Sequence, residues 1–358
     1  MLRISKTQLF ALIVLFEIGS TPLFALGIEA KQDAWLAILI AMISGFFLLW
    51  IYTEIQRHFP DKNLAEILTI ILGKWLAGPL ILLYALYFLF IASFNLREFG
   101  ELIIMTLLPS TPIMVILVVF MLTIFYFLFL GQEALPRTSE VMLPVVLFFI
   151  VLTYVLLIMT GEMDFTELEP ILGDGWTPVL SAAFPTIVNF PFGEMVLFLM
   201  YWKFVNYIEK IRKISFLALG LSGLLLMTSL VMIVSRLGVE YASNQTLPLF
   251  EMIKLINIAD FITNMDIIAS IIIFIGGFYK MTLFFYGGVL SIKHLFKRKH
   301  EKWLIVLTGI LLLWFTLVYF PNLPFHRWIG LKVVIPYVHV PFQIICPSLL
   351  LIIIKLKK

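Results

Sequence analysis

Ten long apolar runs, separated by short polar segments, constrain the fold of this chain more than any other feature of its sequence. An α-helix needs about 20 mostly apolar residues to cross the hydrocarbon core of a bilayer. We therefore expect an all-α integral membrane protein with ten transmembrane helices, forming a single transmembrane domain over residues 1–358. The expected spans are residues 7–28, 35–56, 76–108, 112–130, 141–160, 178–205, 214–235, 262–292, 303–320 and 333–354.

Composition agrees with this class, because 62% of the residues are hydrophobic and only 13% are charged. An average soluble domain is about 25% charged. The first apolar run lacks a small-residue cleavage site and leads into further spans, so we expect no cleavable signal peptide. Cys346 is the one cysteine of the chain, which excludes a disulfide within it.

The distribution of Lys and Arg between the connecting segments sets the expected orientation. Cytoplasmic segments of membrane proteins are enriched in these residues. With the N-terminus inside, eighteen of the 25 basic residues fall on the inner side and six on the outer side, and Lys280 lies within a span. The acidic segment 161–175 then lies outside. We expect both termini to be cytoplasmic.

Residues that break helices interrupt the first and sixth runs near their centres. The first run reads FEIGSTPLFALG from Phe16, and the sixth reads FPTIVNFPFGEMVLF from Phe184. Non-helical backbone at membrane depth is tolerated where it lines a cavity or is buried in protein. Breaks five spans apart in a ten-span chain indicate two inverted five-helix repeats, at about 7–160 and 178–354, with a binding site between the breaks.

The first break has the features of a site for a zwitterion. Thr21 is a suitable N-cap and Pro22 suits a first helical position, so a new half-helix is expected to begin there. Its free N–H groups favour a carboxylate, and the unpaired carbonyl groups near Gly19 favour an ammonium group. The alternative is a proline kink that neighbouring helices satisfy.

Ionisable residues inside expected spans are candidates for charge coupling, because they are costly there unless paired. They are Glu17, Glu194 and Lys280, and Lys280 has the charge to neutralise one of the glutamates. Stripes at helical spacing add candidates, although helix packing explains each stripe alone. They are Tyr279, Thr282 and Tyr286 in the eighth span, and Tyr84, Tyr87, Ile91, Phe94, Glu98 and Glu101 in the third. The expected ligand-binding residues are Gly19, Ser20, Thr21, Tyr87, Ile91, Asn189, Phe190, Gly193, Thr282 and Tyr286.

An intramembrane enzyme is the weaker interpretation. The sequence GLSG (Gly220–Gly223) fits a G-x-S-G pattern, but His326, His339 and the other later histidines are expected near span ends, so close helix packing explains these small residues better. The sequence has no H-E-x-x-H zinc motif and no phosphate-binding loop, and we expect no metal or other cofactor. The basic segment 293–302 is explained by orientation and by contact with lipid, not by nucleic acid.

Four segments resemble the endospore germination permease family. They are ISKTQLFALIVLFEIGS from Ile4, AKQDAW from Ala30, LREFGELIIMTLLPSTP from Leu96 and GGFYKMTLFFYG from Gly276. That family comprises the B subunits of GerA-type nutrient germinant receptors, distant relatives of the amino acid-polyamine-organocation transporters. The resemblance implies a LeuT-like fold with broken first and sixth helices, and a ligand held against the break at residues 19–21.

The resemblance also implies a role. Such a protein binds a small germinant, usually an amino acid, in the inner membrane of the spore, together with an A-type subunit and a lipoprotein C-type subunit. The second hypothesis is a self-sufficient amino acid transporter, in which Lys280 or Glu17 supplies proton or charge coupling in place of a metal ion. Both hypotheses use one pocket, so the sequence separates them poorly.

Overall fold

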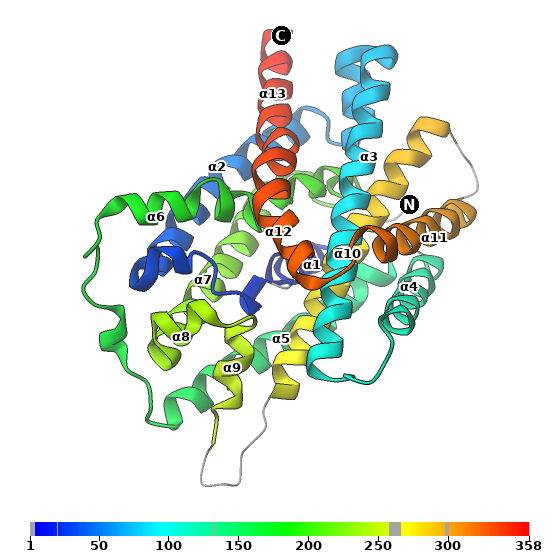
Figure 1. Cartoon of the computed structure of the whole chain (residues 1–358). Helices are drawn as coiled ribbons and strands as arrows, with labels where there is room; N and C mark the ends of the chain where they lie inside the picture. Colours follow the sequence, from blue (N-terminus) through cyan, green and yellow to red (C-terminus); the bar gives the residue numbers. More distant parts are fainter. Residues whose placement is uncertain (1–3, 20, 132, 258–265, 298–300, 358) are drawn as a thin grey trace.

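A computed structural model of the chain describes residues 4–19, 21–131, 133–257, 266–297 and 301–357. These residues form an all-helical molecule, shown in Figure 1. The α-helices are α1 (Lys6–Ile18), α2 (Ala34–His58), α3 (Leu64–Thr106), α4 (Ile113–Phe129), α5 (Ala134–Met159), α6 (Trp176–Ala182), α7 (Ile211–Leu237), α8 (Val239–Asn244), α9 (Pro248–Lys254), α10 (Asp266–Phe296), α11 (Glu301–Tyr319), α12 (Leu323–Ile329) and α13 (Cys346–Leu356).

Segments of 3-10 or π geometry connect several of these helices. They are η1 (Thr21–Leu23), η2 (Ile28–Asp33), η3 (Phe165–Leu168), η4 (Ala183–Ile187), η5 (Phe192–Met200), η6 (Trp202–Phe204), η7 (Ile208–Lys210) and η8 (Gly330–Ile345). Two of them, η4 and η8, have π geometry.

Eight helices or joined runs of helices within the described residues are long and apolar enough to cross a bilayer. They are Ile28–His58, Leu64–Thr106, Ala134–Met159, Trp176–Met200, Ile208–Leu237, Ile267–Phe296, Glu301–Tyr319 and Leu323–Leu356. The other two expected spans are shorter. The first is cut at Gly19, which leaves 13 residues in α1, and the fourth forms α4 with 17 residues.

The expected third span begins earlier than the sequence indicated. Asn63 caps the first turn of α3 in a capping box with Glu66, so the helix begins twelve residues before position 76. Gly73 interrupts the helix with a φ of 73°, a conformation that a residue with a side chain adopts only with strain. The polar start of α3 therefore forms a separate turn before the apolar part.

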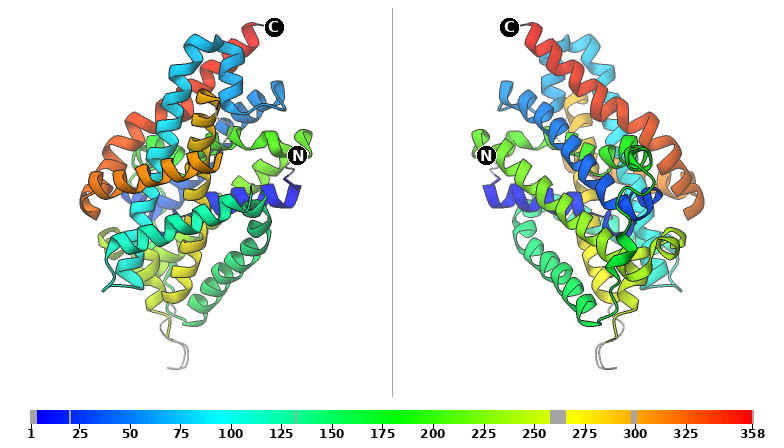
Figure 2. Two further views of the ribbon diagram at one scale, coloured as in Figure 1. Left: turned by 90° about the vertical axis from the view of Figure 1, so that its right-hand side faces the viewer. Right: turned by 90° about the vertical axis from the view of Figure 1, so that its left-hand side faces the viewer.

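Helix α1 lies in the middle of the molecule, where longer helices surround it (Figures 1 and 2). A capping box between Ser5 and Gln8 begins it, with the Gln8 backbone N–H donating to Ser5 Oγ over 3.1 Å. It packs against α5, α7 and α10, and every residue from Ala11 to Ile18 is buried. Its break is therefore enclosed by protein.

Helices α3 and α10 form the most extensive helix pair of the molecule. Glycines on α10 permit the close approach: a methyl group on Gly288 would overlap Leu89 of α3, 2.6 Å away.

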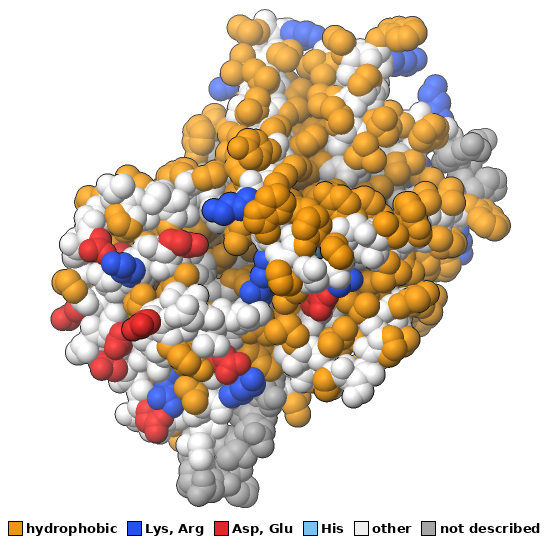
Figure 3. All heavy atoms as spheres, in the orientation of Figure 1, with side chains coloured by type: hydrophobic (Ala, Val, Ile, Leu, Met, Phe, Trp, Pro, Cys, Tyr) orange, Lys and Arg blue, Asp and Glu red, His pale blue; other side chains and the backbone are white. Residues whose placement is uncertain are grey.

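Hydrophobic and acidic side chains gather on different parts of the molecular surface. In Figure 3, hydrophobic side chains cover the region around α3, α4 and α11, whereas acidic side chains gather over α6, α8 and the segment before α6. The hydrophobic region includes exposed Val119, Leu122 and Trp314, as expected for a surface that contacts lipid.

Candidate ligand site at the two helix breaks

The first break is present where the sequence predicts it. Helix α1 ends at Ile18, and Gly19 adopts a φ of 39° and a ψ of −122°. The Thr21 hydroxyl donates to the carbonyl oxygen of Glu17 over 3.0 Å, which satisfies one of the carbonyl groups at the helix end. The expected new half-helix at Thr21 was wrong in extent, because only the three-residue turn η1 forms there. Ser20 lies outside the described residues.

The second break is also present. Helix α6 ends at Ala182 and continues through the π segment η4 into η5, which has 3-10 geometry from Phe192. Between them, the Asn189 amide donates to the carbonyl oxygen of Pro185 over 2.6 Å, and the Tyr52 hydroxyl donates to that of Gly193 over 3.2 Å. The carbonyl groups freed by the break are thus partly satisfied from within the protein.

Three ionisable side chains converge between the breaks. Lys280 Nζ lies 2.5 Å from Glu194 Oε2, with both side chains almost fully buried. The stem of Lys280 runs beside the first break: a methyl group on Gly19 would lie 2.7 Å from Lys280 Cδ. Glu17 is fully buried on α1, and its two carboxylate oxygens have no hydrogen-bond partner among the described residues.

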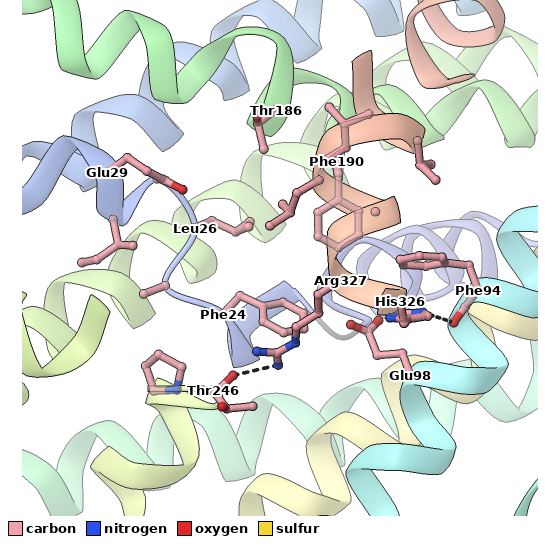
Figure 4. Close-up of a pocket in the computed structure, with 18 of the residues that line it drawn as sticks. Phe24, Leu26, Glu29, Phe94, Glu98, Thr186, Phe190, Thr246, His326 and Arg327 are labelled. Carbon is pink, nitrogen blue, oxygen red and sulfur yellow. Dashed lines mark hydrogen bonds between the residues drawn. The ribbon is translucent and has the colours of Figure 1, made fainter. Parts of the chain in front are cut away.

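A cavity of about 270 Å³ lies beside the breaks (Figure 4). It has about the size of the smallest ligand pockets, which are roughly 300 Å³. The wall comes from the segment after η1, from α3, from the second break, from the α8–α9 region, and from α12 and η8. Its residues are Phe24, Ala25, Leu26, Gly27, Ile28, Glu29, Ile91, Phe94, Asn95, Glu98, Thr186, Phe190, Glu194, Ala242, Ser243, Gln245, Thr246, Pro248, His326, Arg327, Gly330, Leu331, Val334, Ile335 and His339.

Charged and polar groups occupy one end of this cavity. The Arg327 guanidinium donates to the carbonyl oxygen of Thr246 over 2.9 Å and lies 5.5 Å from the ring centroid of Phe24. Figure 4 shows Glu98 beside His326 and Arg327 at this end. The His326 ring stacks on Phe94 at 3.7 Å between centroids. Mostly apolar side chains form the remainder of the wall, so a small ligand with few polar groups fits best.

A buried hydrogen-bond network lies behind this wall. The Tyr87 hydroxyl lies 2.9 Å from His339 Nδ1, and the Gln343 amide donates to the same hydroxyl over 2.9 Å. The Tyr52 hydroxyl donates to the Gln343 carbonyl oxygen over 2.6 Å. The network links α2, α3 and η8, and so fixes the position of η8 relative to the second break.

The structure brings some of the expected ligand-binding residues to the cavity and not others. Ile91 and Phe190 line it, together with Glu194. Gly19, Thr21, Asn189 and Gly193 form the breaks beside it, and Tyr87 belongs to the network described above. The expected residues of the eighth span, now in α10, do not line it. Thr282 donates to the Phe278 carbonyl oxygen of its own helix over 2.6 Å, and the Tyr286 hydroxyl contacts Glu301 Oε1 at 2.5 Å.

Sequence reasoning missed His339 and Arg327. We expected His339 near a span end, but it lies near the middle of the run Leu323–Leu356 and is buried in the cavity wall. This run starts before the expected span 333–354 because Asn322 caps α12: its side chain accepts a hydrogen bond from the backbone N–H of Phe325. The asparagine and the following Leu-Pro were the signal for this helix start. Ser222 of the GLSG sequence donates to the Ala218 carbonyl oxygen of its own helix.

Comparison with known proteins places the chain among proteins of spore germination. A family model described as "Spore germination protein" matches residues 3–322. Spore germination protein KB of Bacillus subtilis (strain 168) is 33% identical over 356 residues, which cover 99% of this chain and 95% of the relative. Spore germination protein YndE of the same organism is 24% identical over 270 residues, or 75% of this chain and 73% of the relative.

Solved structures of transporters share the fold. Mhp1, a nucleobase-cation-symport-1 family transporter with bromovinylhydantoin bound, has a TM-score of 0.68 at 13% identity, covering 91% of this chain and 75% of Mhp1. A manganese transporter of Eremococcus coleocola has a TM-score of 0.58 at 12% identity, covering 96% of this chain and 74% of the transporter. At these identities the likeness shows the fold alone, which is that of LeuT-like transporters.

Proposed function

The chain belongs to the spore germination protein family, and from this premise we propose that it is the membrane subunit of a nutrient germinant receptor. In this proposal a small germinant, most simply an amino acid, binds in the cavity beside the two breaks. Binding shifts the population of conformations at the breaks, and the shift passes to partner subunits and triggers germination.

The observation that carries this proposal is the cavity itself. Its wall includes the segment after the first break and residues of the second break, Phe190 and Glu194. A ligand there would contact both broken helices at once, so its binding energy would depend on their relative position. The volume of about 270 Å³ suits an amino acid better than a larger metabolite.

The finer architecture belongs to the same proposal. We propose ten membrane-embedded helices in two inverted repeats, at about residues 7–160 and 178–354, each beginning with a broken helix. The short helices α1 and α4 are then counted with the eight longer spans. Two matched breaks and the likeness to Mhp1, which covers 91% of this chain, support it.

Partners and location are the next part of the proposal, supported by the family. We propose that the chain assembles with an A-type subunit and a lipoprotein C-type subunit in the inner membrane of the spore, with both termini in the cytoplasm. The excess of Lys and Arg in the segments assigned to the inner side supports this orientation.

A self-sufficient amino acid transporter is the second candidate function. The observation that favours it is the fold, which this chain shares with Mhp1 at a TM-score of 0.68. In that case the buried pair of Lys280 and Glu194 would supply charge coupling across the site. The two candidates differ in one property, because a transporter accumulates its ligand without any partner and a receptor subunit does not.

The test combines the purified chain with spores. The chain is reconstituted in liposomes, and binding and uptake of each of the twenty common L-amino acids are measured beside germination of spores that lack the gene. Binding without accumulation, together with loss of one nutrient response, establishes the receptor subunit. Concentrative uptake by the chain alone, with normal germination of the mutant spores, establishes the transporter and refutes the receptor.

A further inference from the structure

One buried cation lies between two buried carboxyl groups where the broken helices face each other. Glu17 is the next-to-last residue of α1, Glu194 lies in η5, and Lys280 lies in α10. Lys280 Nζ is 2.5 Å from Glu194 Oε2, whereas neither oxygen of Glu17 has a hydrogen-bond partner within the described part of the chain. The stem of Lys280 nevertheless passes the end of α1, where a methyl group on Gly19 would lie 2.7 Å from Lys280 Cδ. Only one of the two carboxyl groups is therefore engaged.

Glu194 is the member of this triad that the cavity exposes. It lines the cavity together with Phe190, whereas Glu17 and Lys280 are not part of the wall. A carboxylate in the wall of a small buried site favours a ligand with an ammonium group, because charge-assisted hydrogen bonds are strong where water is excluded. Such a ligand would compete with Lys280 for the same carboxylate.

Two aromatic rings, one from each broken helix, flank the Lys280 ammonium group. The Nζ atom lies 4.3 Å from the ring centroid of Phe190 and 5.4 Å from that of Phe16. Phe16 directly precedes Glu17 in α1. Aromatic faces attract a cation without holding it in one geometry, and the four-carbon stem of lysine is flexible. The ammonium group is therefore free to leave Glu194 and move past Phe16 towards the end of α1, the helix that carries Glu17.

We propose that Lys280 changes partner when ligand binds: it pairs with Glu194 in the empty site and with Glu17 once the ammonium group of a ligand occupies Glu194. The inference rests on the proposed function and narrows its ligand to small molecules that carry a protonated amine. It also gives Glu17 a role as the second acceptor, although Glu17 does not touch the ligand.

The exchange would reach the first helix break directly. The Lys280 stem runs so close to Gly19 that even a methyl group on this glycine would lie 2.7 Å from Lys280 Cδ. A move of the ammonium group carries this stem along the backbone of the break. Ligand binding in the cavity, whose wall contains Glu194, would thereby change the backbone conformation at the end of α1.

Glu17→Gln tests the second acceptor, a residue that does not touch the ligand. Glutamine has nearly the same shape but lacks the charge that would hold Lys280, so the displaced ammonium group has no partner and we expect both ligand binding and the germination response to fall about tenfold or more. The exposed acid Glu209 gives the matched control Glu209→Gln. Binding is measured on the purified chain in nanodiscs with a mixture of the twenty common L-amino acids, and the response in spores that carry each variant.

Glu194→Gln tests the ligand class. We expect it to weaken binding of the amino acid mixture about tenfold or more. A mixture of Nα-acetylated amino acids with uncharged side chains, which lacks any ammonium group, should bind neither the variant nor wild type. Because Glu194→Gln would let Lys280 pair with Glu17 without any ligand, the double variant Glu194→Gln, Lys280→Met provides a version of the site in which both of these charges are absent. We expect it to fold and still to lose binding.

Infrared difference spectra report on Glu17 itself. They compare the protein with the amino acid mixture bound and the protein without it. We expect a ligand-induced carboxyl signal in wild type that Glu17→Gln removes and Glu209→Gln keeps. A normal germination response of Glu17→Gln, or a signal that it keeps, overturns the exchange while the receptor function stands. If wild type binds no amino acid and spores without the gene germinate normally, the proposed function falls and the exchange falls with it.

Discussion

At the scale of single residues, the first break depends on the absence of a side chain at Gly19. Its φ of 39° disfavours any other residue, and the space where a side chain would lie is taken by Lys280. Gly19, which breaks the helix, therefore leaves the space that the Lys280 side chain fills. The lysine stem passes the first break, and its ammonium group contacts Glu194 of the second break.

Replacement of Gly19 tests the position of the site. We expect Gly19→Leu to abolish the ligand response while the protein stays in the membrane, because the side chain displaces Lys280 and strains the backbone. Gly78→Ala is the control, because a methyl group there meets no atom within 4 Å. A Gly19→Leu variant that responds normally would show that the ligand binds elsewhere. Membrane content is followed by immunoblot and response by germination.

Tyr87 provides a second test, directed at stability. Its hydroxyl bonds to both His339 and Gln343, so Tyr87→Phe leaves buried polar groups with fewer partners. We expect a loss of about 1–3 kcal/mol in the free energy of unfolding. Tyr337→Phe, at a tyrosine that is 74% exposed, should change it by less than about 0.5 kcal/mol. Thermal denaturation in detergent measures both, and equal effects would refute the structural role of the network.

Residues near the breaks were predictable from the sequence, and those of the far cavity wall were not. Acids, glycines and prolines inside apolar runs are costly, so Glu17, Gly19 and Glu194 stood out. Arg327 is an ordinary residue at the end of a span and becomes notable only because Thr246 and Phe24, distant in sequence, lie beside it. Such pairings between loops leave no periodic pattern.

At the scale of elements, α10 packs directly against the backbone of the first helix break. A methyl group on Gly276 would lie 2.7 Å from the Gly19 carbonyl oxygen and 3.0 Å from its Cα and N atoms. Gly276 therefore permits direct contact between α10 and the backbone of the first break. Helix α10 also carries Lys280, four residues further on, so one helix face provides both the close approach and the charge.

Gly276→Ala should move α10 away from the break. Because the overlap is with backbone atoms, which cannot rotate away, we expect a loss of about 1–3 kcal/mol in stability and a weaker ligand response. Gly220→Ala on α7 is the control, since its nearest contact would be an ordinary 3.4 Å to Phe46. Thermal denaturation and germination are measured for both. If the two variants behave alike, the contact between α10 and the break is unimportant.

Element types were easier to predict than element ends. The apolar runs gave the long helices, but α3 and the last run both began about ten residues before the predicted spans, because polar caps at Asn63 and Asn322 start helical turns outside the apolar region. The extent of η1 was also mispredicted. Thr21 serves as a cap for the preceding helix and not as the start of a long new one.

At the scale of the whole molecule, the asymmetry of charge predicts one orientation. Cys346 is the single cysteine, so a Cys346→Ala background allows one new cysteine to be labelled at a time. In protoplasts, a membrane-impermeant maleimide should label Asp164→Cys without permeabilisation and Glu209→Cys only after it. The reverse pattern would place the termini outside. Both positions are exposed, so accessibility to solvent is matched and only the side of the membrane differs.

The overall architecture was largely predictable, because the bilayer permits few solutions. An all-helical membrane protein follows from the apolar runs, and two matched breaks pointed to the transporter fold that the comparison with Mhp1 shows. The packing of α1 against α5, α7 and α10 did not follow. A uniformly apolar helix has no face that its sequence distinguishes, so its neighbours are fixed only by the assembled shape.

The bond from Arg327 to the Thr246 carbonyl oxygen joins the segment between α8 and α9 to α12, and both segments are part of the cavity wall. A ligand that enters past them must first break this bond, and one that leaves must break it again. The bond therefore slows entry and exit equally. In Arg327→Gln we expect association and dissociation rates to rise together while the equilibrium affinity changes little, so that the arginine sets how long a bound ligand stays in the cavity.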